Sequence, residues 1–142
     1  MKLSRIAMAA IAASVLIGLS GCGTSKNHLL KIDESQVQLR SIQTRAFDTT
    51  EKNKMLRTII TTLQDFDYVL DKADATLGMI SATKLDEHQY RITVTVRPRG
   101  ETQLLVRANV QYKQKAVKDP IIYQNFFTSL AKSIFLTAHE VD

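Results

Sequence analysis

Two alternating runs near the middle of the chain constrain its fold more than any other feature of the sequence. Residues 90–97 carry Tyr, Ile and Val at even positions, and Arg and Thr at odd positions. Residues 104–112 carry Leu, Val, Ala and Tyr at even positions. A period of two residues is typical of a strand with one face buried. Because Pro98 and Gly100 separate the runs, we predict an antiparallel hairpin with one apolar and one polar face.

Two helices are predicted on either side of the central strands. The first begins after Asp48, which we interpret as an N-cap with Glu51 three residues later. It ends near Phe66-Asp67, where no glycine is present, so that either Asp67 takes the left-handed conformation or the helix end frays. The second begins at Asp119-Pro120, with the proline at the first helical position. Apolar residues recur at helical spacing in both segments, at Met55, Ile59, Leu63 and Phe66 and at Tyr123, Phe127, Leu130, Ile134 and Ala138.

The remaining apolar segments predict three further strands, over residues 37–47, 68–71 and 79–84, the first with a bulge near residues 40–41. The order is therefore β-α-β-β-β-β-α. This order predicts an α+β fold in which an antiparallel sheet of about five strands packs both helices on one face. The pattern over residues 37–138 resembles the helix-grip domains of small envelope lipoproteins such as BamC. The resemblance rests on the order of elements and implies a fold, not a function.

The N-terminus has the features of a secretory leader. Lys2 and Arg5 precede an apolar run over residues 6–19, which is too short to span a bilayer as a helix. Leu19-Ser20-Gly21-Cys22 resembles the lipobox of bacterial lipoproteins. That resemblance implies cleavage after Gly21 and lipidation of Cys22. An ordinary signal peptide with a free cysteine, or an uncleaved anchor, remains an alternative.

The predicted organisation is a signal peptide over residues 1–21, a lipidated tether over residues 22–36 and one domain over residues 37–142. Gly23 in place of aspartate resembles the sorting pattern of enteric lipoproteins that reach the outer membrane. We therefore expect an outer-membrane anchor with the domain in the periplasm. The thirteen residues after Cys22 extend at most about 45 Å, so the domain would stay near its membrane.

Few residues are available for catalysis or cofactor binding. Cys22 is the single cysteine, and the three histidines, at 28, 88 and 139, are widely separated. The acidic cluster Asp65, Asp67, Asp71 and Asp74 lacks the glycine and glutamate of a calcium-binding EF-hand loop. We therefore expect no enzymatic activity, no metal and no cofactor. The charge of +5 falls to +3 without Lys2 and Arg5, which does not favour nucleic acid as a partner.

The polar face of the predicted sheet is the candidate partner-binding surface. Its candidate contact residues are Arg91, Arg97, Arg99, Leu105 and Arg107. A solvated face is the simpler interpretation of the same residues. The leading functional hypothesis is a lipid-anchored accessory that binds a protein of an envelope complex in assembly, secretion or efflux. The alternatives are a binder of lipid or another small hydrophobic ligand between the sheet and the C-terminal helix, and, less favoured, an envelope hydrolase.

Overall fold

The computed structural model describes residues 35–136. The chain divides into two compact units, Met1–Gln36 and Val37–Asp142. The leader, Cys22 and the tether lie outside the described residues. In the described range the fold is α+β, as predicted, with six strands in one antiparallel sheet and three helical segments.

The sheet has the strand order β1-β5-β4-β3-β2, and every neighbouring pair is antiparallel. Its strands are β1 (Thr44–Phe47), β2 (Tyr68–Asp74), β3 (Met79–Lys84), β4 (Arg91–Arg99), β5 (Gln103–Tyr112) and the short β6 (Lys115–Ala116), which pairs with β5. The predicted hairpin is β4–β5, in the register Val96 opposite Val106. The alternation in the sequence therefore identified the centre of the sheet.

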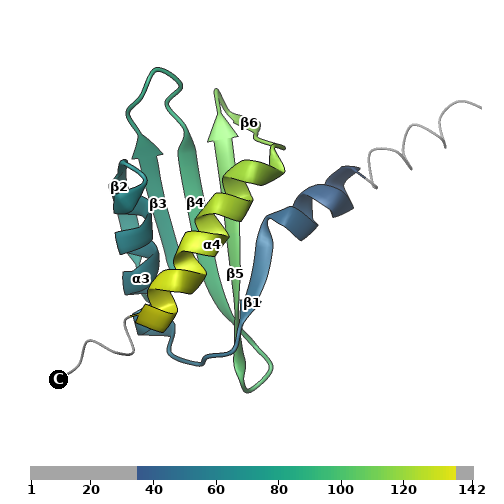
Figure 1. Cartoon of the computed structure of the whole chain (residues 1–142), viewed down its shortest axis with the longest axis vertical. Helices are drawn as coiled ribbons and strands as arrows, with labels where there is room; N and C mark the ends of the chain where they lie inside the picture. Colours follow the sequence, from purple (N-terminus) through teal and green to yellow (C-terminus); the bar gives the residue numbers. More distant parts are fainter. Residues whose placement is uncertain (1–34, 137–142) are drawn as a thin grey trace, which may run out of the picture. The chain divides into compact units, whose positions relative to one another are not determined.

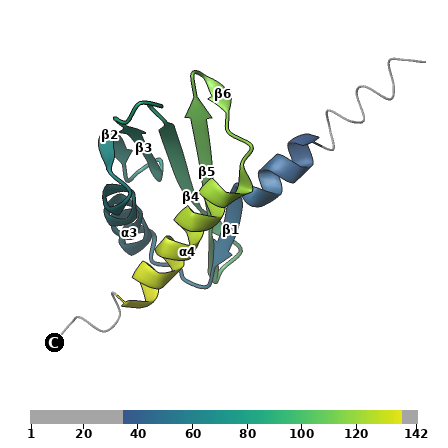
Figure 2. The ribbon, with the colours of Figure 1, turned by 45° about the horizontal axis from the view of Figure 1, so that its top comes forward.

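Helices α3 (Lys52–Asp65) and α4 (Pro120–Leu136) lie on the same face of the sheet (Figure 1, Figure 2). The even-numbered residues of β4 from Ile92 to Val96 and of β5 from Leu104 to Val110 point toward them and are buried. The core joins these side chains to Met55, Ile59, Leu63, Tyr123, Phe126, Phe127 and Leu130 of the helices. Because the helices supply bulky side chains, the space between α4 and the sheet is largely filled.

The prediction of a strand over residues 37–47 is wrong in its first half. Residues 35–42 are helical, and only Thr44–Phe47 form a strand. Leu39 and Gln43 are buried and Ile42 is half-buried, a spacing of three and four residues that fits one face of a helix. The apparent break in strand alternation near residues 40–41 was thus the helical period of this segment.

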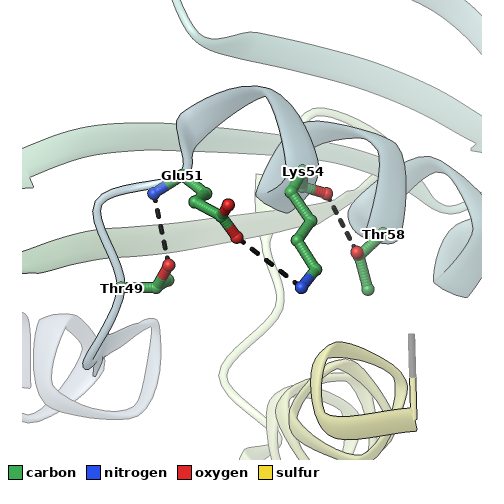
Figure 3. Close-up of polar contacts among 4 residues, drawn as sticks. All are labelled: Thr49, Glu51, Lys54 and Thr58. Atoms are coloured by element: carbon green, nitrogen blue, oxygen red, sulfur yellow. Dashed lines mark hydrogen bonds and ion pairs between the residues drawn. The ribbon is translucent and has the colours of Figure 1, made fainter. Parts of the chain in front are cut away.

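The start of α3 also differs from the predicted capping box. Asp48 does not cap the helix, because its carboxylate accepts a hydrogen bond from Gln103 at 2.6 Å. Instead the Glu51 backbone N–H donates to the Thr49 hydroxyl at 3.2 Å, and the Glu51 carboxylate lies 3.6 Å from the Lys54 ammonium (Figure 3). The helix therefore begins at Lys52, about one turn later than Asp48 suggested.

Two helix boundaries agree with the sequence, whereas β2 continues to Asp74, three residues beyond the predicted strand over residues 68–71. Asp67 follows α3 with a φ of 62°, the left-handed conformation expected in the absence of a glycine. The Asp119 carboxylate accepts the Ile121 N–H at 3.0 Å, as expected for the N-cap of α4. Residues 113–118, between the predicted hairpin and the second helix, contain β6, a strand that the sequence did not indicate.

The outer edge of β5 pairs with two strands, β1 and β6, and between them with single groups of Gln43, Val117 and Tyr123. β1 covers residues 104–107 and β6 covers residues 111–112. Between them, the Ala108 N–H donates to the Gln43 carbonyl, and the Val110 carbonyl accepts the Val117 N–H. The Val110 N–H donates to the hydroxyl of Tyr123 at 3.3 Å. That hydroxyl also donates to the Val117 carbonyl at 2.7 Å and accepts from the Gln43 amide at 3.3 Å.

We expect Tyr123→Phe to lower the free energy of unfolding by about 2–3 kcal/mol, because it leaves buried backbone and amide groups without a partner. Tyr112→Phe is the matched control, since the Tyr112 hydroxyl makes no hydrogen bond among the described residues, and its effect should stay within about 0.5 kcal/mol. Urea denaturation of both variants measures the difference. Equal stabilities would show that this hydroxyl does not support the sheet edge.

Candidate functional site

The sheet face opposite the helices is the candidate site, and neither α3 nor α4 covers it (Figure 2). Odd-numbered residues of β4 and β5 form its centre, where Arg97 is directly opposite Leu105 and Thr95 is directly opposite Arg107. These residues also line a shallow depression of about 410 Å³, whose lining is Thr93, Thr95, Arg97, Leu105, Arg107 and Asn109. The alternation of β4 and β5 therefore gives the centre of this face a polar surface in which Leu105 is the one apolar residue of these two strands.

The five candidate residues all lie on this face, but they are not one cluster. Arg97, Arg99, Leu105 and Arg107 come together near the β4–β5 turn. Arg91 is opposite Gln111, six residues from Arg97 along β4, which places it roughly 20 Å away. It lines a separate polar recess of about 470 Å³ with His88 and Tyr112. We name Arg97, Arg99, Leu105 and Arg107 the arginine cluster.

The arginine cluster carries three positive charges that no ion pair among the described residues neutralises. No carboxylate of the described residues forms an ion pair with Arg97, Arg99 or Arg107. Arg107 donates to the Gln43 side-chain oxygen at 3.4 Å, a long and neutral contact. Because an arginine binds carboxylate or phosphate through two parallel hydrogen bonds, this surface suits an anionic partner.

Gln43 connects the arginine cluster to the core, a link that the sequence did not reveal. Its side chain is 2 % exposed and donates to both the Tyr123 hydroxyl and the Asn109 side-chain oxygen, at 3.3 and 3.4 Å. Asn109 belongs to the open face, whereas Tyr123 belongs to α4. One buried amide thus fixes side chains on both sides of the sheet edge. The sequence feature that could have revealed this link is a glutamine placed at helical spacing from the apolar residue Leu39, a position where burial is expected.

Between α4 and the central strands of the sheet, the space available to a ligand is small. A recess of about 180 Å³ lies at its mouth, lined mainly by aromatic and aliphatic side chains that include Phe66, Tyr68, Tyr90, Ile122 and Phe126. Pockets that enclose drug-sized molecules usually exceed about 300 Å³. The residues farther inside, such as Leu130, are fully buried and leave no comparable room.

Tyr68 is the titratable group that this recess perturbs. Its burial, and next the nearby charge of Asp86, raise the pKa of the Tyr68 hydroxyl to about 12. The hydroxyl is therefore protonated throughout the physiological range. No group of three or more metal-ligating side chains comes together in residues 35–136, and His88 is stacked on Tyr90 at 5.8 Å.

Comparisons with known proteins do not assign the chain to a family. No protein-family model matches the chain, and no curated protein is significantly similar to it. In the range 35–136, no helix has both the length and the apolar character needed to cross a bilayer.

The raised pKa of Tyr68 predicts a specific loss of stability at alkaline pH. The unfolded chain releases this proton near pH 10, whereas the folded chain keeps it until about pH 12. The folded state is therefore favoured below pH 10, and that advantage disappears as the pH rises through 12. Urea unfolding between pH 9 and 11.5 should show a steeper decline for the wild type than for Tyr68→Phe. Parallel declines would contradict the assignment.

Proposed function

We propose that this protein is a lipid-anchored periplasmic accessory of the outer membrane, which binds and steadies an envelope complex through the open face of its sheet. The observation that carries the proposal is the arginine cluster, in which three unneutralised arginines surround Leu105 on a face that neither α3 nor α4 covers. The lipobox-like Leu19-Ser20-Gly21-Cys22 supplies the argument for the anchor.

Physical considerations favour contact over a merely solvated face. Arg97 and Arg107 occupy diagonal positions on adjacent strands, within reach of each other as long side chains, so their like charges repel. An acidic partner surface would relieve that repulsion, while Leu105 would lose its contact with water. The helix arrangement supports the likeness to helix-grip envelope lipoproteins, and the small recess beside Tyr68 gives less support to the alternative of an enclosed lipid.

The proposal is tested by reversing charge on the open face. The variant is the tagged full chain carrying Arg97→Glu and Arg107→Glu. We expect the amount of each specifically co-purified envelope protein to fall at least tenfold relative to the wild type, because two attractive contacts become repulsive. Quantitative mass spectrometry after mild solubilisation measures the change. Arg57→Glu is the matched control, since Arg57 is exposed on α3, and it should retain the wild-type set.

A second arm addresses the anchor separately. Cys22→Ser should abolish incorporation of an alkyne-labelled fatty acid and release the protein from the outer-membrane fraction. Incorporation of the label into Cys22→Ser would contradict the proposed anchor. Recovery of the same co-purified proteins from the charge-reversed variant and the wild type would contradict the proposed role of the open face.

A further inference from the structure

A groove of about 720 Å³ lies between β1 and α4. Its floor and walls include Phe47 of β1 and Phe127, Ala131, Ile134 and Phe135 of α4. Phe135 is 74 % exposed, an unusual state for a phenylalanine on a helix that packs against the core. Arg45 and Lys132 lie among the residues that line the groove. We call this recess the β1–α4 groove.

Strand β1 borders the groove and is an edge of the sheet. It pairs only with β5, and the Gln43 carbonyl accepts the Ala108 N–H. By the alternation of an antiparallel ladder, Arg45 and Phe47 bond toward β5, whereas Thr44 and Ala46 direct their backbone groups away from it. No described strand pairs with that outer edge, and Ala46 is exposed.

We propose that the β1–α4 groove binds an extended peptide segment of a partner protein, which pairs with β1 as an added strand. The backbone N–H and C=O groups of Thr44 and Ala46 on this outer edge are matched by the alternating donors and acceptors of a second backbone. A lipid acyl chain has no such donors and acceptors and could not pair with the strand. The side chains of an added strand alternate between faces, so every second one would enter the apolar groove. The expected ligand therefore has apolar residues at alternate positions.

The charges of the groove indicate an acidic residue in the same peptide. The Arg45 guanidinium donates only to carbonyls, those of Ser41 at 3.3 Å and Thr44 at 3.1 Å, and it lies 5.4 Å from the centre of the Phe127 ring. The nearby Asp48 carboxylate is engaged by Gln103. A carboxylate on the peptide would draw Arg45 away from the Thr44 carbonyl. That movement would free this acceptor for the backbone N–H of the added strand.

The probe is a fluorescein-labelled nonapeptide of alternating Val and Thr with a Glu at one end. Its binding is measured by fluorescence anisotropy with protein purified in mild detergent from cells expressing the full chain. We expect binding to the alternating peptide and at least tenfold weaker binding to the same peptide with N-methylated backbone amides. A peptide of the same composition with its valines adjacent should also bind at least tenfold more weakly.

Two variants test the two parts of the groove. Ala46→Pro removes a backbone N–H that points away from β5, so the pairing of β1 with β5 loses no hydrogen bond. It should weaken binding of the peptide about fivefold. Ala131→Glu places a negative charge in the apolar groove and should weaken binding at least tenfold. Thr61→Glu, at an exposed position of α3, is the matched control. Thermal unfolding of each variant shows whether it folds.

The outcomes separate this proposal from its competitors. Absence of binding at millimolar peptide, equal binding of the N-methylated peptide, or unchanged affinity in both folded variants would overturn it. Self-association that these variants abolish, without peptide binding, would show that a second copy occupies the groove and would also overturn it. The Arg97→Glu/Arg107→Glu protein should bind the probe as the wild type does, so that failure of the open-face proposal leaves this result unaffected.

Discussion

The hydroxyl of Tyr123 completes the edge of β5, and the arrangement of the sheet depends on it. β1 and β6 leave a gap along that edge, and a buried backbone group without a partner is costly. Tyr123 fills the gap from α4 while its ring packs in the core, so one residue fixes the helix against the sheet. Gln43 extends the same network toward Asn109 and Arg107 on the opposite face. The core and the candidate site are thereby held in one register.

The two sides of the sheet then take different roles. Because both helices lie on one face of the sheet, the core contains the hydrophobic side chains of that face, and neither helix covers the other face. The arginine cluster and the β1–α4 groove lie on opposite sides of the strands near β5 and β1. An anchored protein with two such surfaces would be suited to hold two parts of an assembly, one through charge and one through strand pairing.

The parts of the fold that were predictable are those in which the sequence period is unambiguous. The even positions of residues 90–112 identified the buried face, and Asp67 and Asp119 marked helix boundaries through backbone and capping chemistry. The segment 35–42 was misassigned because it is short and half polar, so that strand and helix periods fit nearly equally well. β6 was missed because its turn uses Lys113 and Gln114 at positive φ, where glycine or asparagine is the usual signal. The open-face arginines were placed by alternation alone, whereas the Gln43 link and the β1–α4 groove depend on how α4 crosses the sheet.

The central claim is that the open face contacts a partner in the cell, and site-specific photocrosslinking tests it most directly. A benzophenone amino acid replaces Leu105 in the full chain, and in a parallel protein it replaces Leu85, which is 72 % exposed in the β3–β4 connection. The account predicts a discrete adduct with an envelope protein from position 105 that disappears when Arg97 and Arg107 are reversed, and no such adduct from position 85. The absence of an adduct at position 105, or the same adduct from both positions, would contradict it.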